Sequence, residues 1–151
     1  MKMPIHILTL AVALCAGLTS LNAAEPPGPA SKAAPKGGRL LEKTEPRAEF
    51  VVEKDHSVTI HFYSDDMKPV AATTQVVVVI AEAKDGKARI EFEKRGDALV
   101  SKTRLPESDG YNLVVQFRPT ADAKPMNLRF KLDLGICGEC RRAEYACICG
   151  H

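Results

Sequence analysis

The chain has 151 residues, enough for one domain that buries its own core. Its formal charge is nearly balanced, with 21 Lys and Arg residues against 19 Asp and Glu residues, so neither a nucleic acid nor an anionic membrane surface is an expected partner. The absence of Trp and the presence of only three Tyr and five Phe residues disfavour binding to stacked bases or to sugars.

The start of the chain predicts export from the cytoplasm. One lysine precedes residues 5–18, an apolar stretch too short for a permanent membrane helix. Residues 1–23 are therefore predicted to be a signal peptide, with cleavage after Ala23 or Ala24. Lipidation at Cys15 is an alternative, but the leucine before it is too large for the usual pattern. We expect a periplasmic or secreted protein of the bacterial envelope, with no stable membrane insertion after removal of the signal.

Residues 24–38 are predicted to be a flexible linker. They consist mainly of Pro, Gly, Ala, Ser and Lys, and four of them are proline. Such a segment has little apolar surface to bury, so burial cannot offset the entropy lost on ordering the backbone.

Alternation of apolar and polar residues begins at residue 39 and predicts strands. The first pair covers residues 49–63, with a turn at residues 54–57, and forms a β-hairpin. Glu49, His61 and Tyr63 fall on the face of this hairpin opposite its apolar residues. The run of β-branched residues at 76–80 is typical of a central strand that is covered on both faces.

Four further strands are expected after this central strand. The first covers residues 89–93, after a turn at Asp85 and Gly86, and a short one follows at residues 99–100. The last two cover residues 111–117 and 126–134, where the alternation is strongest.

These patterns together predict an all-β fold. No segment after residue 25 has apolar residues at the helical period of 3.6, and turn signals recur often. We therefore expect an antiparallel β-sandwich of about seven or eight strands over residues 39–136, followed by an irregular Cys-rich C-terminal tail at residues 137–151. A partly open barrel is the nearest alternative.

The tail contains every cysteine of the predicted mature chain. The candidate metal ligands are Cys137, Cys140, Cys147, Cys149 and the terminal His151. Soft ions such as Zn²⁺ or Cu⁺ need three or four converging thiolate or imidazole ligands, and the short spacings with nearby glycines permit such convergence. Five candidates exceed the four that a tetrahedral zinc ion requires.

Disulfide bonds are the main alternative for these cysteines. An oxidising compartment favours them, and four cysteines can pair in three ways. Any such bond closes a short loop within the tail, so it cannot hold the predicted sandwich together and the tail would organise only itself. A redox-active dithiol is a third possibility, and the side chains of Arg141 and Arg142 would favour the thiolate form of Cys140 in each case.

No arrangement of residues predicts catalysis, so we expect a protein that is not an enzyme. Asp65 and Asp66 lie next to Lys68 and Pro69 and are typical of a loop. His56 and His61 lie in and beside the hairpin turn and are expected to be surface residues.

Residues 35–42, the hairpin that follows, and Lys68, Pro69 and Val70 resemble a small exported bacterial domain. That domain also forms the N-terminal part of periplasmic adaptor subunits of heavy-metal efflux pumps. The resemblance covers about residues 35–134 and implies a β-sandwich of the cell envelope with a link to metal handling. Members often have His-Gly-Gly where this chain has Lys36, Gly37 and Gly38, so a ligand from that histidine cannot be assigned here, and the adaptor's long coiled hairpin is absent too.

Two functions follow from the sequence. The first is an exported, non-enzymatic metal-binding or metal-handling protein that uses the C-terminal cysteines. The second is a structural or protein-interaction β-domain whose tail is closed by disulfides and whose sheet edges meet an envelope protein partner.

Overall fold

The computed structural model describes residues 32–108 and 110–150 of the chain. The predicted signal peptide, most of the predicted linker and His151 lie outside the described residues. Nine strands and one turn of 3₁₀ helix make up the described part. The strands are β1 (Arg39–Leu41), β2 (Arg47–Val52), β3 (Val58–Tyr63), β4 (Pro69–Val70), β5 (Val76–Ala83), β6 (Gly86–Arg95), β7 (Ala98–Ser101), β8 (Tyr111–Arg118) and β9 (Met126–Leu132), and the 3₁₀ turn is η1 (Glu144–Ala146).

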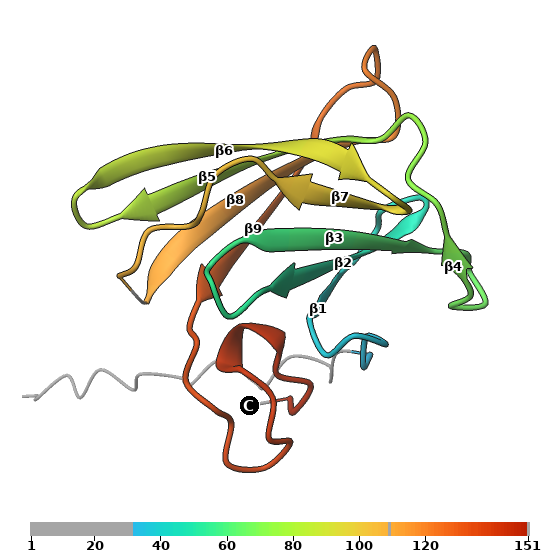
Figure 1. Ribbon diagram of the computed structural model, residues 1–151. Helices are drawn as coiled ribbons and strands as arrows, with labels where there is room; N and C mark the ends of the chain where they lie inside the picture. The colour runs from blue at the N-terminus through green and yellow to red at the C-terminus, as the bar shows by residue number, and fades with distance from the viewer. Residues whose placement is uncertain (1–31, 109, 151) are drawn as a thin grey trace, which may run out of the picture.

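All strand pairs are antiparallel, and their order is β1-β2-β3-β7-β6-β5-β8-β9, with β4 added beside β3. Strand β6 is shared between two layers, because residues 86–91 pair with β5 and residues 92–95 pair with β7. The sheet therefore folds over itself like a barrel that stays open between β1 and β9 (Figure 1). Within the described residues, no helix is long and apolar enough to cross a membrane.

This architecture confirms the predicted all-β, antiparallel fold in two packed layers. The predicted hairpin is present as β2 and β3, and the strands expected after it are present as β5 to β9. The strands that the sequence did not reveal are β1 and β4, which have three and two residues and are too short to show an alternation.

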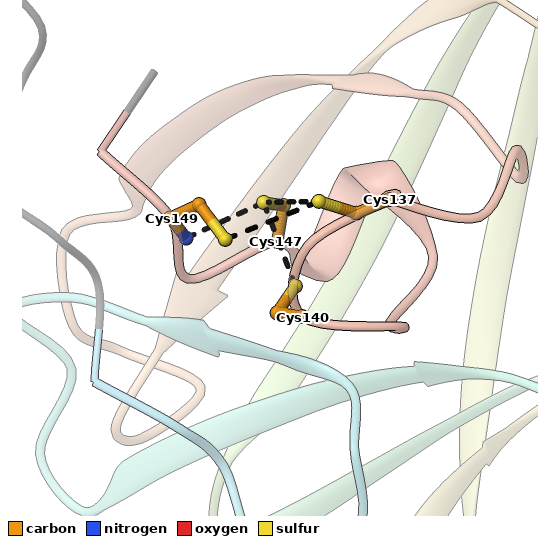
Figure 2. A group of neighbouring side chains, drawn as sticks. All are labelled: Cys137, Cys140, Cys147 and Cys149. Atoms are coloured by element: carbon orange, nitrogen blue, oxygen red, sulfur yellow. Dashed lines mark hydrogen bonds between the residues drawn. The ribbon is translucent and has the colours of Figure 1, made fainter.

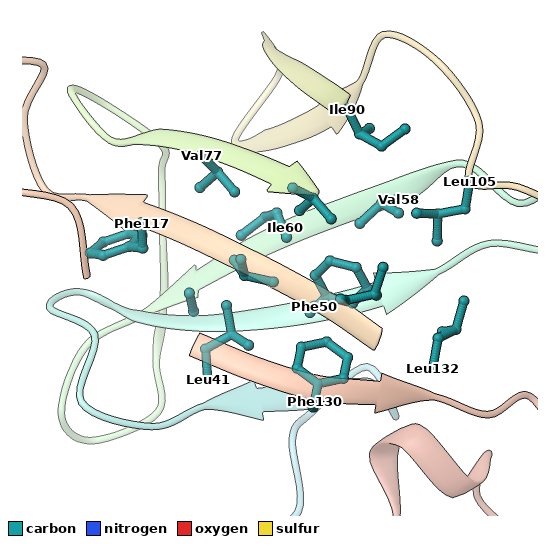
Figure 3. Close-up of a cluster of buried hydrophobic side chains, with 14 of the residues drawn as sticks. Leu41, Phe50, Val58, Ile60, Val77, Ile90, Leu105, Phe117, Phe130 and Leu132 are labelled. Carbon is teal, nitrogen blue, oxygen red and sulfur yellow. The ribbon is translucent and has the colours of Figure 1, made fainter. Parts of the chain in front are cut away.

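The core fills the space between the two layers. Alternate residues of each strand point inward, as the period of two requires, and the aromatic rings of Phe50 and Phe130 meet edge to face at 5.4 Å (Figure 3). In β5 the buried residues are Val77, Val79 and Ala81. Val76, Val78 and Ile80 are only half-buried, so the expectation that this strand is covered on both faces is wrong. The strand is central in the sheet, but none of the other described strands forms a second layer over its outer face.

The end of the predicted linker belongs to the folded domain. Ala34 is buried, and the backbone N–H groups of Lys36 and Gly38 donate hydrogen bonds to the carboxylate of Glu49 at 2.8–3.1 Å. The hydroxyl of Tyr63 donates another to the same carboxylate at 2.6 Å. The prediction of a flexible linker over residues 24–38 is therefore wrong for residues 34–38. These residues cover the face of the hairpin on which its polar side chains lie.

Two features explain why this segment lies so close to the hairpin. A side chain at Gly38 is excluded, because a Cβ atom there would lie 2.3 Å from the carbonyl oxygen of Phe50. Glu49 is fully buried, and a buried carboxylate is stable only when donors satisfy its oxygens. The backbone N–H groups of residues 36 and 38 supply those donors.

Candidate metal centre

The four cysteines of the tail converge on one point. Their sulfur atoms all lie within 4.8 Å of one another (Figure 2). The individual Sγ–Sγ distances are 3.5 Å for Cys137 and Cys147, 3.7 Å for Cys140 and Cys147, and 3.9 Å for Cys137 and Cys149. Among the described residues, no other group of three or more histidines, cysteines and carboxylates is close enough to hold a metal ion.

These distances suit a tetrahedral thiolate site. Zinc–sulfur bonds of about 2.3 Å at tetrahedral angles place the sulfurs about 3.8 Å apart. The three Sγ–Sγ distances of 3.5–3.9 Å lie around this value. They are well beyond the sulfur–sulfur bond of about 2.05 Å in a disulfide. One ion at the centre of the cluster could therefore bind all four sulfurs with little movement of the chain.

A tight turn presents the first two cysteines. Ile136 and Ala143 form an isolated antiparallel bridge, and between them the N–H of Cys137 donates to the carbonyl of Arg142 at 2.8 Å. The N–H of Arg141 donates back to the carbonyl of Cys137 at 3.1 Å. Arg141 has φ of 60°, the left-handed conformation that reverses the chain directly after Cys140. The turn thus brings both sulfurs to the same side.

The η1 turn positions the other two cysteines and attaches the whole segment to the sheet. Tyr145 in this turn is buried, and its ring packs against Phe50 at 6.4 Å and Phe130 at 6.5 Å. Its hydroxyl accepts a hydrogen bond from the N–H of Val52, and its carbonyl accepts one from Nη1 of Arg39, both at 3.0 Å. Because Tyr145 lies between Cys140 and Cys147 in the sequence, the segment that forms the cluster also contacts the core.

We refer to residues 135–150 as the C-terminal clasp, which Figure 1 shows lying beyond the ends of β9 and β1. The expectation that the tail organises only itself is wrong, because Tyr145 and Ala146 belong to the main hydrophobic core. Backbone hydrogen bonds add to this attachment: the N–H of Tyr145 donates to the carbonyl of Asp133, and that of Glu144 donates to Gly135. Closing the cluster therefore fixes a segment that covers one end of the sheet.

The pKa of the Cys140 thiol is lowered to about 6. The main cause is a hydrogen bond from the backbone N–H of Ile148 to its sulfur, followed by one from the N–H of Arg142. The expectation that the side chains of Arg141 and Arg142 favour this thiolate is wrong, because the main donors that lower the pKa are backbone N–H groups. The guanidinium of Arg142 instead lies 3.5 Å from the carbonyl of Ala34, to which it donates.

The neighbouring thiols change in the opposite direction. Burial raises the pKa of Cys149, and hydrogen bonds to Cys140 and Cys147 raise it further. The pKa of Cys147 is also raised, although the backbone N–H of Cys149, which lies 3.4 Å from its sulfur, acts against the increase. When thiols lie this close together, ionisation of one of them opposes ionisation of its neighbours, because the thiolates repel each other. A bound cation would remove that repulsion and allow all four cysteines to bind as thiolates.

A search of protein-family models, of curated proteins and of solved structures finds no match to this chain. The interpretation of the site therefore depends on its geometry. Four of the five predicted ligands lie together, and the fifth, His151, lies outside the described residues. His56 and His61 lie outside the cluster, and both are half-buried rather than the fully exposed surface residues that were expected. The residue that the sequence analysis missed is Tyr145, whose only signal was an aromatic side chain between two pairs of cysteines.

Proposed function

We propose that this is an exported, non-enzymatic metal-binding protein that holds one Zn²⁺ ion with Cys137, Cys140, Cys147 and Cys149. The observation that carries the proposal is the convergence of four sulfurs at distances suited to a tetrahedral site. Tetrahedral S₄ geometry favours zinc among the soft ions, and Cu⁺ is the competing cargo for the same thiolates.

The ligand count supports a role without catalysis. Catalytic zinc sites keep one coordination position open for water or substrate, whereas structural sites are closed by four protein ligands. The four cysteines fill all positions of a tetrahedral ion, and His151 is not needed. The function that follows is to hold or buffer the ion and to keep the C-terminal clasp on the sheet.

Export supports metal handling in the envelope. The charged start, the short apolar stretch and the small residues at 23 and 24 are typical of a signal peptide. The resemblance of residues 35–134 to the adaptor domain of heavy-metal efflux pumps points to the same compartment and the same class of cargo. In that compartment a bound ion would also compete with oxidation of the thiolates to disulfides.

Metal titration of the reduced protein tests this function. The wild type should bind about one Zn²⁺ per chain, and replacing Cys140 and Cys147 by Ser should abolish binding. A double variant with Gln at His56 and His61 is the matched control, because it removes two potential ligands outside the cluster. Circular dichroism should show sheet in all three proteins.

The outcome also separates the two functions left open by the sequence. Equal and weak zinc binding by the wild type and the Ser variant would contradict the metal site. Native protein whose mass shows two disulfide bonds and no bound metal would favour the structural or protein-interaction domain with a disulfide-closed tail.

A further inference from the structure

A groove follows the line where the sheet fails to close. Strand β1 pairs only with β2, and β9 pairs only with β8, so the two strands face each other without a ladder between them in the described part of the chain. The groove between them has a volume of about 250 Å³ and is lined by residues 39–43 and 126–130. We call it the seam groove.

The seam groove offers apolar contacts to an added chain. Met126 is an exposed large hydrophobic residue at 36%, and Leu40 and Leu128 are half-buried. The volume is enough for about two apolar side chains, given that pockets for whole small molecules start near 300 Å³. The unpaired edges of β1 and β9 are typical positions for an extended peptide to add main-chain hydrogen bonds.

The charges at the groove select the chemistry of that peptide. Arg39, Lys43 and Arg129 line it, against one acid, Glu42. Lys43 and Arg129 are exposed. The guanidinium of Arg129 forms an ion pair with the carboxylate of Glu82 on β5, so a partner's carboxylate would share Arg129 with Glu82, whereas Lys43 has no such ion pair among the described residues. An acidic partner would find complementary charge, and a basic one would meet repulsion.

The same charges argue against a second copy of this chain. An antiparallel pairing of two β9 strands centred on residue 129 would place Arg129 of one copy opposite Arg129 of the other. It would also place Lys131 of each copy opposite Asn127. Like charges directly opposite across a strand pair are destabilising, so self-association in this register is disfavoured.

We propose that the seam groove binds an extended segment of a partner protein in which acidic and apolar residues alternate. The segment lies between β1 and β9, its apolar side chains contact Met126 and Leu128, and its carboxylates face Arg129 and Lys43. This proposal concerns a second site and does not depend on which metal the cysteines hold.

Peptide binding to the full protein tests the proposal. The probe is a fluorescein-labelled seven-residue peptide that alternates glutamate and valine, measured by fluorescence anisotropy. It should bind at least tenfold more tightly than the same peptide with lysine in place of glutamate. Methylation of alternate backbone nitrogens should weaken it by a similar factor, because a methylated nitrogen cannot donate to a strand edge.

Charge reversal locates the site. The double variant Lys43→Glu and Arg129→Glu should lose at least tenfold in affinity for the acidic peptide. The control Lys94→Glu and Arg104→Glu has the same net charge, with both changes at exposed residues outside the groove lining, and should change affinity less than threefold. Circular dichroism confirms that both variants are folded.

Other results would overturn the proposal. Equal binding of the acidic and basic peptides, or equal effects of the two double variants, would mean that the groove does not select this chemistry. A dimer in sedimentation that Arg129→Glu dissociates would assign the groove to a second copy. A tenfold gain in peptide affinity on deletion of residues 24–31 would assign it to the chain's own N-terminal segment.

Discussion

Replacing Tyr145 by Phe should weaken zinc binding as well as folding. The ring and its contacts with Phe50 and Phe130 are kept, and only the hydroxyl that accepts from the N–H of Val52 is lost. A partly buried donor left without its acceptor costs about 1–2 kcal/mol. If the clasp must lie on the sheet for the four sulfurs to meet, this energy appears in the zinc dissociation constant, which rises roughly 5- to 30-fold.

Competition with a chromophoric zinc chelator measures this change in the reduced protein. Tyr111→Phe is the matched control, because the hydroxyl of Tyr111 donates a partly buried hydrogen bond to the carbonyl of Pro106 at 3.0 Å, but from β8 rather than from the clasp. That variant should lose folding stability and keep its zinc affinity within about threefold. An unchanged zinc dissociation constant in Tyr145→Phe, with reduced stability, would refute the coupling between the clasp and the cluster.

Three further predictions concern single groups. Glu49→Gln should lower the free energy of unfolding by about 2–4 kcal/mol in denaturant titration, because an amide cannot accept from every donor that faces this carboxylate. Arg141→Gly should keep zinc affinity within about threefold and leave melting temperature equal or higher, whereas Arg141→Val should lower it, because β-branched residues are strained at positive φ. In the metal-free protein, Cys140 should be alkylated first and Cys149 last. The alkylation rate at Cys140 should rise with pH through about 6, because the reactive thiolate predominates above its pKa. Mass spectrometry of digests after timed alkylation checks the order.

The strands could be predicted because their burial comes from side chains with a period of two. The hairpin of β2 and β3 and the alternation in β8 and β9 follow directly from apolar residues at every second position. The closure of the two layers through β6 could not be predicted, since one strand changes partner along its length. That change depends on pairing between distant segments, which periodicity does not report.

The contacts made by backbone groups were missed for a physical reason. Residues 34–38 have few apolar side chains, and their attachment depends on N–H donors that meet the carboxylate of Glu49. A prediction from composition counts apolar side chains that can be buried, so it assigns a segment with few of them to a linker. Glu49 itself alternates with apolar neighbours and was placed on the polar face of the hairpin, where the returning segment buries it completely.

The cysteine spacings predicted that the sulfurs could converge, and four of them do, but the spacings did not predict how the tail contacts the fold. The length of a loop closed by a disulfide depends only on the cysteine positions, so it does not indicate whether another side chain of the tail packs into the core. Tyr145 is the side chain that packs into the core, where it is buried and accepts a hydrogen bond from the N–H of Val52.

Arg39 connects the clasp and the seam groove in one structure. Its guanidinium lies over the ring of Phe130 at 4.9 Å and donates to the carbonyl of Tyr145 at 3.0 Å. Partial burial lowers the pKa of this group, yet an arginine remains charged at neutral pH, so a half-buried cation stays at the junction. Because the same side chain lines the seam groove, release of the clasp would remove the Tyr145 carbonyl as a hydrogen-bond acceptor and leave the Arg39 guanidinium to reorient in the groove lining.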